Sequence, residues 1–280
     1  GDVYKRQVLE PGICTGLFAA LMPEGLRDVS HVTGIELDPV TARIARLLQP
    51  QARIVTADFA RTELPSSFDL AIGNPPFSDR TVRSDRAYRS LSLRLHDYFI
   101  ARSIDLLKPG AFAAFVTISG TFDKADCSAR EHIAQSADLA AALRLPEGSF
   151  RADAGTDVVV DILFFRKRKA GEAEGDVSWL DRDEIRAASA DEAAIRVNRW
   201  FATHPDFVLG THATMSGLFG ETYTCLPRGG VDLEQALDAA ISLLPGALYD
   251  GEPEPIKDNA GEVDDSADMT NVAGHGVREG

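Results

Sequence analysis

Apolar residues in the first 168 positions alternate between short continuous runs and stripes at helical spacing. The short runs have the length and β-branched content of buried strands. They predict strands at 8–10, 31–37, 52–58, 68–74, 111–120, 138–145 and 157–168. Strands that alternate with helices are typical of a parallel, doubly wound α/β sheet.

The segments between these runs predict helices. Asp38-Pro39 marks a helix start, because aspartate caps the first turn and proline fits its first position. The stripe that follows has apolar residues at helical spacing: Val40, Ile44, Leu47 and Leu48. Further helices are predicted at 15–22, 95–110 and 123–136, and the one at 95–110 is expected to be amphipathic and to end at Pro-Gly.

The pattern weakens after residue 168. A linker is predicted first, then helices at 183–202 and 231–244, the second opening with Asp232 and Gln235 as a capping box. Residues 251–280 are acidic, glycine-rich and poor in large apolar side chains, which predicts a disordered linker. We therefore expect a main domain over 8–168 and a small, mainly helical appendage over 169–250.

The composition allows a sizeable core, with 44% hydrophobic and 8% aromatic residues. No apolar run approaches the length of a membrane span. The three cysteines, Cys14, Cys127 and Cys225, are far apart and form no CxxC, so neither a disulfide framework nor a metal site is predicted. This cysteine usage suits a reducing cytoplasm.

The net charge of −14 is unevenly distributed. Residues 1–168 carry 21 Lys and Arg against 21 Asp and Glu, whereas residues 169–280 carry 8 against 22. An acidic tail beside a neutral body is compatible with nucleic-acid binding by the body.

The first seven residues, GDVYKRQ, precede the first predicted strand. Asp2 to Gln7 can be back-translated as GAT-GTG-TAT-AAG-AGA-CAG, which resembles the end of a common transposon sequencing adapter. We expect residues 1–7 to be an artefact of library preparation and the chain to open in mid-protein. The alternative is a short basic N-terminal segment.

Four separate motifs fall at the carboxyl ends of predicted strands, where doubly wound sheets bind ligands: Glu10 to Gly16, Glu36, Asp58 and Asn74 to Phe77. The small-residue turn in VLEPGICTGLF lets a ligand approach the backbone closely. Glu36 follows that turn at the distance where a carboxylate commonly holds ribose hydroxyls. Each motif alone also fits a plain turn or a solvated acid, but together they predict a nucleoside-binding rim.

In this order and spacing, EPGICTG, GIELD, ADF and GNPPF resemble S-adenosylmethionine-dependent amino-group methyltransferases, in particular the N6-adenine DNA methyltransferases. The resemblance runs from Val8 to about Arg168. Two later stretches, LHDYFIARSIDLLKPGAFAAFVTISGTFDK and LRLPEGSFRADAGTDVVVDILFFRKR, resemble the methylase portion of very large methylase–helicase proteins of plasmids and phages. HPDFVLGTHATMSGLFGETYTC resembles the segment that follows the methylase there.

The resemblance implies a Rossmann-like methyltransferase fold with a seven-stranded, mostly parallel sheet and helices on both faces. It implies S-adenosylmethionine as cofactor, DNA with a flipped adenine as substrate, and fusion to a downstream helicase. Residues 8–168 would be the catalytic domain.

The resemblance also assigns roles to residues at the rim. The methionine part of the cofactor would be lined by Glu10, Pro11, Gly12, Cys14, Thr15 and Gly16, with Asn74 adjoining. Glu36, beside Leu37, would bind the ribose, and Asp58 with Phe59 would bind the adenine. Cys14 stands where the family usually has glycine, and the family's N-terminal motif, which helps to complete the pocket, is expected upstream.

The NPPF motif would hold the target base through Asn74, Pro75, Pro76 and Phe77. An exocyclic amine is a poor nucleophile because its lone pair is conjugated into the ring. Hydrogen bonds to the Asn74 side-chain carbonyl and the Pro75 backbone carbonyl would expose that lone pair, and the prolines would fix both acceptors. Phe77 would stack on the base, which must leave the duplex stack. This chemistry requires no general base and no metal.

An arginine-rich stretch follows the motif, with Arg80, Arg83, Arg86, Arg89 and Arg94. Phosphate contacts by these side chains would make binding fall steeply with salt. The alternative is a solvated, partly paired face, because Asp79 and Asp85 interleave. Tyr88 could stack on a base or serve packing.

Three functions stay open from the sequence. The first is methyl transfer to adenine N6 in DNA, and the second is transfer to RNA guanine or protein glutamine, since these enzymes share the Asn-Pro-Pro-aromatic set. The third is a catalytically inactive methylase-like module that binds DNA or a partner.

Overall fold

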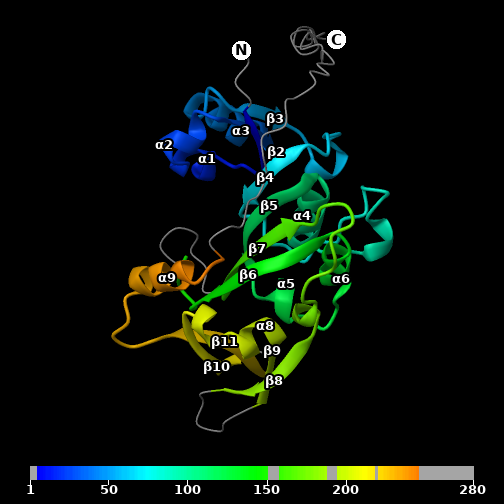
Figure 1. The fold of residues 1–280 in the computed structure, drawn as a ribbon. Helices are drawn as coiled ribbons and strands as arrows, with labels where there is room; N and C mark the ends of the chain where they lie inside the picture. Colours follow the sequence, from blue (N-terminus) through cyan, green and yellow to red (C-terminus); the bar gives the residue numbers. More distant parts are fainter. Residues whose placement is uncertain (1–4, 151–157, 188–193, 218–219, 246–280) are drawn as a thin grey trace, which may run out of the picture.

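A seven-stranded sheet in the order β3-β2-β1-β4-β5-β7-β6 forms the centre of the protein (Figure 1). The computed structural model describes residues 5–150, 158–187, 194–217 and 220–245. The strands are β1 (Arg6–Pro11), β2 (Ser30–Glu36), β3 (Arg53–Thr56), β4 (Phe68–Gly73), β5 (Leu107–Ile118), β6 (Ala137–Leu145) and β7 (Val160–Lys167). Only β7 runs antiparallel to its neighbours in this sheet, so the predicted mostly parallel sheet is confirmed.

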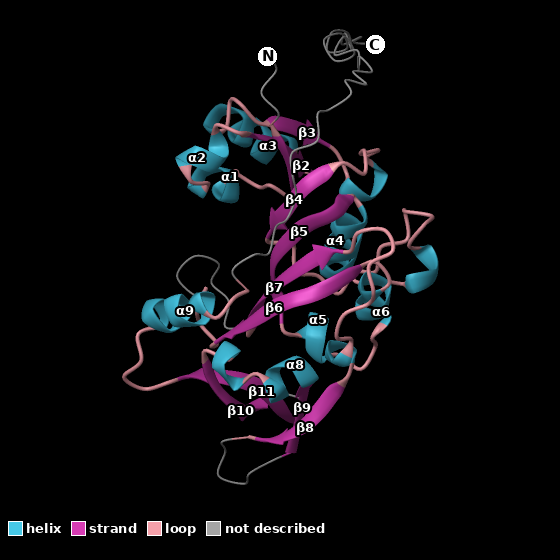
Figure 2. Ribbon diagram, in the orientation of Figure 1, coloured by secondary structure: helices cyan, strands magenta, loops and turns pink. Residues whose placement is uncertain are grey.

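Helices cover both faces of the sheet, with α1–α3 on one side and α4 and α6 on the other (Figure 2). They are α1 (Leu17–Leu21), α2 (Glu24–Arg27), α3 (Pro39–Leu48), α4 (Leu95–Asp105), α5 (Gly120–Asp123) and α6 (Ser128–Ala134), with short 3₁₀ turns η1 (Phe59–Arg61) and η2 (Arg89–Leu91). Asp38 caps α3 as predicted, its carboxylate accepting from the Thr41 backbone N–H at 2.7 Å.

The start of β1 overlaps the suspected adapter sequence. Arg6 and Gln7 pair with Ser30 and His31 of β2, whereas residues 1–4 lie outside the described part of the chain. Strand pairing uses backbone groups that any such sequence supplies, so the adapter hypothesis stays a prediction. The predicted disordered linker over 251–280 also lies outside the described residues.

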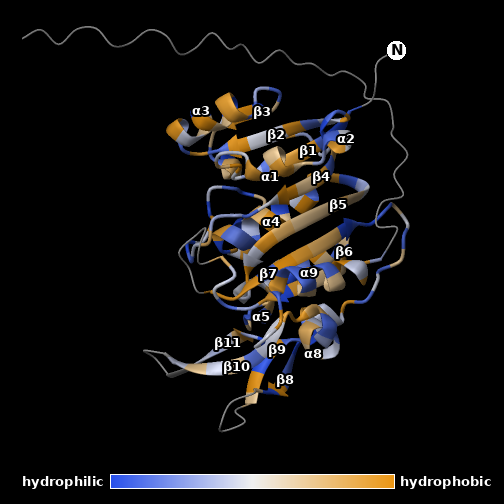
Figure 3. Ribbon diagram, turned by 90° about the vertical axis from the view of Figure 1, so that its left-hand side faces the viewer, coloured by the Kyte–Doolittle hydropathy of each residue, from blue (hydrophilic) through white to orange (hydrophobic). Residues whose placement is uncertain are grey.

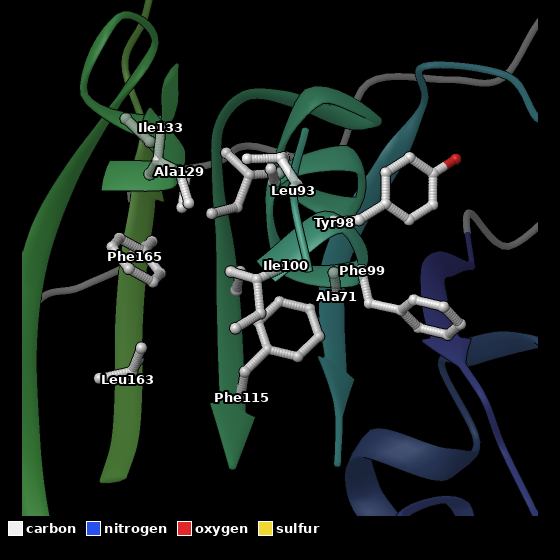
Figure 4. Packing of buried hydrophobic residues seen from close by; sticks show 14 of the residues in the cluster. Ala71, Leu93, Tyr98, Phe99, Ile100, Phe115, Ala129, Ile133, Leu163 and Phe165 are labelled. Carbon is white, nitrogen blue, oxygen red and sulfur yellow. The ribbon is translucent and has the colours of Figure 1, made fainter. Parts of the chain in front are cut away.

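Helix α4 is buried nearly all round, so its predicted amphipathic character is wrong. Figure 4 shows Tyr98, Phe99 and Ile100 packed beside Ala71 of β4 and Phe115 of β5. Even its polar residues His96, Asp97 and Ser103 are buried, because the helix is also covered by the loop before it and by α6. A helix between a sheet and a second layer has no solvent face.

Two predicted helix ends are also wrong. Helix α4 stops at Asp105, and Pro109-Gly110 lies inside β5, where Gly110 adopts φ 82°. The pairing of β4 with β5 shifts register across this point, between Phe68 and Leu70, so the Pro-Gly pair bends a strand. The helix predicted at 123–136 is divided into α5 and α6, because Asp126 turns the chain by accepting from the Ser128 N–H.

The apolar stripe of α3 faces outward. Val40, Ile44, Leu47 and Leu48 are 41–76% exposed, and the helix instead buries Ala42 and Ala45 (Figure 3). Leu17 and Leu21 of α1 are exposed as well. The spacing correctly predicted a helix with one apolar face, but not the side on which that face lies.

The appendage after residue 168 is richer in strands than expected. It contains β8 (Arg182–Arg186), β9 (Ala194–Asn198), β10 (Gly210–Gly217) and β11 (Gly220–Pro227), with helices α8 (Arg199–Thr203) and α9 (Leu233–Ser242) and the turns η3 (Ser178–Leu180) and η4 (Pro205–Phe207). The mainly helical appendage and the helix at 183–202 are therefore wrong. Helix α9 matches its prediction, and Asp232 caps it by accepting from the Glu234 N–H.

The physical reason for the β8–β9 hairpin is alternation. A small cluster contains Ile185, Ala187, Ile195 and Val197, and it packs against Tyr223. The Ala, Glu and Arg residues of this stretch favour a helix, but burial of the apolar residues in a strand pair outweighs that preference.

The appendage shares a core with the main sheet. Trp179 stacks on Phe122 with ring centroids 5.8 Å apart, and Phe201, Val208 and Cys225 join the same cluster. The fully buried Arg144 of β6 forms two 2.8 Å hydrogen bonds to Asp161, and its guanidinium lies 4.1 Å from the Phe201 ring centroid. These contacts lie at the carboxyl ends of β5 and β6, the edge on which β1 and β4 also end.

Candidate active site

The turn after β1 carries the first predicted motif. Gly12, Cys14 and Gly16 have φ of 67°, 54° and 85°, a region that glycine adopts freely and other residues rarely do. Cys14 is therefore strained where the family usually has glycine. Thr15 beside it is exposed, and Gly16 begins α1.

Glu36 closes this turn against β2. Its carboxylate accepts from the Cys14 N–H at 3.0 Å and from the Asp38 N–H at 2.9 Å. One such bond on each oxygen leaves lone pairs for ribose hydroxyls, so the predicted role fits this geometry. Leu37 is 65% exposed next to it.

Glu10 lies beneath the same turn and is 2% exposed. Its Oε2 atom is buried and has no hydrogen-bond partner among the described residues. Burial raises the pKa of Glu10 to about 8, although the backbone N–H groups of Ala19 and Phe18 oppose the rise. A buried acid with a free oxygen can receive a cationic or hydrogen-bonding group at the rim.

The NPPF motif abuts the first turn, as the rim hypothesis requires. A β-carbon built on Gly12 would lie 3.6 Å from Cδ of Pro76, and one on Gly73 would lie 3.4 Å from the Pro11 carbonyl oxygen. Pro75 is buried, whereas Asn74 is exposed. The structure thus brings the loop of Asn74 and the turn after β1 together, with the buried Pro75 anchoring the loop.

Phe77 is 38% exposed and Pro76 is exposed beside it. A phenylalanine with an open ring next to an exposed amide is the arrangement that stacking on an extruded base requires. The four motif residues therefore keep their predicted places on the rim.

Asp58 and Phe59 have different surroundings. Asp58 caps η1 by accepting from the Ala60 N–H at 2.9 Å, and its side chain stays 37% exposed. Phe59 is 2% exposed, with its ring 4.8 Å from that of Phe99 and 4.7 Å from the Arg102 guanidinium. Of the predicted rim residues, Phe59 lies in the core, so an adenine contact there would come from its backbone.

The arginine-rich stretch forms an exposed loop, residues 78–94, which we call the arginine loop. Arg80, Arg83, Arg86 and Arg89 are exposed, and Arg89 donates to the Arg83 carbonyl at 3.1 Å. Arg94 pairs with Asp79 at 2.8 Å, whereas Arg80, Arg83 and Arg86 have no ion-pair partner among the described residues. Of these arginines, only Arg94 forms, within the described part of the chain, the kind of ion pair that the alternative of a partly paired surface predicts.

Tyr88 serves packing rather than base stacking. It is 7% exposed, its ring meets those of Tyr98 and His132 at 5.2 and 5.4 Å, and its hydroxyl donates to Asp105. No group of three His, Cys, Asp or Glu side chains in the described ranges could hold a metal. No helix in those ranges is long and apolar enough to cross a membrane.

The sequence did not predict two residues that support the turns of the candidate site. Gln49, after α3, donates to the Gly16 carbonyl at 3.3 Å and packs against the glycine itself. Arg102 of α4 holds the turn that follows Asp58. Neither stands in a motif, and only the folded chain brings them to the rim.

The fold is the Rossmann-like fold of the S-adenosylmethionine-dependent methyltransferases. A methyltransferase subunit of a type I restriction-modification system from Streptococcus thermophilus has a similar structure, with a TM-score of 0.51 at 18% identity over 60% of this chain and 41% of that one. At this identity the likeness speaks for the fold alone.

Within that class, the predicted resemblance to N6-adenine DNA methyltransferases is confirmed. Residues 36–145 match the family model of the Eco57I restriction-modification methylase. A phage P1 protein, defense against restriction protein B, is 29% identical over 265 residues, which are 89% of this chain and 11% of that protein.

Two further relatives are methyltransferases by name, one of type II and one that acts on a transfer RNA. The type II methyltransferase M.CvrRI of Paramecium bursaria Chlorella virus XZ-6E is 27% identical over 61% of this chain and 45% of its own. A tRNA1(Val) (adenine(37)-N6)-methyltransferase from Aliivibrio fischeri is 27% identical over 39% of this chain and 51% of its own. The chain thus spans about half or less of each of these relatives.

Proposed function

We propose that this chain transfers a methyl group from S-adenosylmethionine to the exocyclic N6 amine of an adenine in DNA. The observation that carries the proposal is the close approach of Pro76 to the turn after β1, where a β-carbon built on Gly12 would lie 3.6 Å from Cδ of Pro76. This approach sets the exposed Asn74 beside that turn. The relation to restriction-modification methylases supports DNA as the substrate.

The rim fits the cofactor. The turn from Glu10 to Gly16 offers a glycine-lined approach, and Glu10 offers a buried, unpartnered oxygen. Glu36 would hold the ribose, and Asp58 the adenine through its exposed carboxylate. S-adenosylmethionine, when bound, supplies an electrophilic methyl carbon on a sulfonium.

The chain's own residues would prepare the amine. The Asn74 side-chain carbonyl and the Pro75 backbone carbonyl would accept its two N–H groups, which frees the nitrogen lone pair for attack on the methyl carbon. The nitrogen would gain the methyl carbon as its bond to sulfur breaks, with the bonding pair staying on sulfur, and the methylated nitrogen would give one proton to solvent. Phe77 would hold the extruded base by stacking.

Asn74→Ala tests this mechanism. We expect methyl transfer to DNA to fall by at least about 100-fold, because positioning of the amine is lost, while cofactor affinity changes little. Ser66→Ala, an exposed change before β4 at a residue with no proposed role, controls for general disturbance of the fold. Methylation by Asn74→Ala at the rate of the unaltered chain would overturn the role of the motif.

The main alternative substrate is an adenine or guanine in RNA, since a tRNA methyltransferase is among the relatives. That relative aligns with 39% of this chain, whereas the phage P1 protein aligns with 89%, the appendage included. Parallel assays on duplex DNA and on transfer RNA decide between them. A non-catalytic module is the second alternative, favoured by the strain at Cys14.

We further propose that the parent protein joins this methylase to a helicase, as the resemblance of the later segments implies. The alignment with 11% of the phage P1 protein supports a place within a much larger polypeptide.

A further inference from the structure

Arg102 of α4 connects two parts of the proposed site. One is the turn after Asp58, residues 58–62, which we call the cofactor turn. The Arg102 guanidinium donates to the carbonyl oxygens of Phe59 and Thr62 and lies 4.7 Å from the centroid of the Phe59 ring. A planar guanidinium can donate hydrogen bonds to both carbonyl oxygens at once, which a lysine ammonium cannot do in the same geometry.

The other part is the arginine loop. Asp85, in the middle of this loop, accepts from the Tyr98 hydroxyl at 2.8 Å. The same hydroxyl accepts from Nη1 of Arg102 at 3.0 Å, and Nε of Arg102 lies 3.9 Å from the Asp85 carboxylate. Asp85, Tyr98 and Arg102 therefore form one network from the arginine loop to the cofactor turn.

The network is largely shielded from solvent. The side chains of Arg102 and Asp85 are 12% and 16% exposed, so their attraction is less screened than that of a surface pair. An open cavity of about 370 Å³ adjoins it, lined by Ala60 to Leu64, by Ser84 to Arg86 and by Arg102 itself. The cofactor turn and the arginine loop thus meet at this network and line one cavity together.

We propose that Asp85 and Arg102 are positioning residues that couple cofactor binding to nucleic-acid binding by the arginine loop. The inference rests on the proposed function. A cofactor that orders the cofactor turn also orders the carbonyls that hold Arg102, and Arg102 with Tyr98 fixes Asp85. Arg80, Arg83 and Arg86 are then already positioned to contact phosphates, so DNA binding need not order the loop again. Coupling of this kind is reciprocal between the two ligands.

The test compares Asp85→Asn with Asp79→Asn. Both changes remove one negative charge from the same loop, but Asp79 pairs with Arg94 and does not touch Arg102. Affinity for an adenine-containing DNA duplex is measured with and without S-adenosylhomocysteine, the demethylated form of the cofactor. We expect S-adenosylhomocysteine to tighten DNA binding about tenfold in the unaltered chain and in Asp79→Asn. In Asp85→Asn we expect it to tighten DNA binding less than about twofold.

A second readout does not depend on DNA. Hydrogen exchange of the peptide over 58–62 should speed up several-fold in Asp85→Asn and stay unchanged in Asp79→Asn. In turnover assays Asp85→Asn should raise KM for DNA and leave kcat within about twofold.

Equal coupling and equal exchange in the two variants would overturn the network. Failure of the unaltered chain to methylate DNA would overturn the proposed function instead. The binding comparison with and without S-adenosylhomocysteine needs no methyl transfer, so it still decides the coupling, and the exchange comparison decides whether Asp85 holds the turn.

Discussion

The two halves of the sheet are covered very differently. Around β3, β2 and β1, the face that α1 to α3 cover has, among the described residues, only a small buried cluster of Ile13, Ala42, Ala45 and Ile54, while leucines of α1 and α3 stay exposed. Around β5, β7 and β6, aromatic rings from α4 and the appendage build a large core. The first half is held by glycine turns and hydrogen bonds such as Cys14 to Glu36.

The proposed active site lies where these halves meet, between β1 and β4. There the loop from Asn74 to Phe77 lies against the turn after β1, which we propose to bind the cofactor. The side proposed for the target base thus adjoins the larger core, whereas the side proposed for the cofactor depends more on backbone geometry.

Removal of the buried guanidinium at the appendage should have the largest effect. Arg144→Ala leaves Asp161 buried without its partner, so we expect the free energy of unfolding to fall by about 3–5 kcal/mol. Urea titration measures this loss. Arg196→Ala removes an exposed pair with Glu184 and should change stability by less than about 1 kcal/mol. Equal losses would mean that the pair of Arg144 and Asp161 is not shielded from solvent in the folded protein.

Glu10→Gln should show a pH-dependent gain in stability. The folded pKa of Glu10 is raised from 4.5 to about 8, so its favourable contribution is complete below pH 4.5 and is lost as the pH rises to about 8. The variant should therefore exceed the unaltered chain by a few kcal/mol at pH 9 and match it near pH 4.5.

Chemical unfolding at both pH values checks this, with Glu24→Gln on the exposed surface of α2 as the control for loss of charge. A pH-independent difference between Glu10→Gln and the unaltered chain would show that burial does not raise the pKa.

Much of the site could be predicted because strand ends and motif order suffice to place it. Parallel strands deliver their carboxyl ends to one edge, so Glu36, Asp58 and Asn74 had to share it once the strands were correct. The burial of Phe59 and Tyr88 could not be predicted, because it depends on α4, whose residues approach from about 40 positions away in the case of Arg102 and Phe59.

The same limit explains α3 and the β8–β9 hairpin. Periodicity reveals an apolar face but not what covers it, so the stripe of α3 predicted a core that the described residues do not form there. Ile185 and Val197 favour strands, but Ala, Glu and Arg residues around them favour helix, and burial against neighbours such as Tyr223 decides between the two.

Cys14→Gly tests whether the turn after β1 is strained. Cys14 adopts φ 54°, and glycine removes that strain at the expense of greater freedom in the unfolded chain. We expect a net gain of up to about 1 kcal/mol in stability and tighter cofactor binding. Cys127→Gly, at φ −99°, should lower stability slightly. A loss of stability in Cys14→Gly would contradict the strain argument.

The smallest effect is expected on the outer face of α3. Leu47 is 76% exposed, so Leu47→Ala should change the free energy of unfolding by less than about 0.5 kcal/mol. Ile104→Ala on the buried helix α4 should cost about 2–5 kcal/mol. Thermal or urea unfolding compares the two helices directly, and a large cost at Leu47 would show that something covers this face.

Calorimetric titration of the 280-residue chain with S-adenosylmethionine tests the central claim most directly. The account predicts saturable binding at one site, weakened by at least about tenfold in Asp58→Ala, because a carboxylate contact to the cofactor is lost. Absence of binding up to millimolar cofactor, or unchanged affinity in Asp58→Ala, would contradict the assignment of the rim.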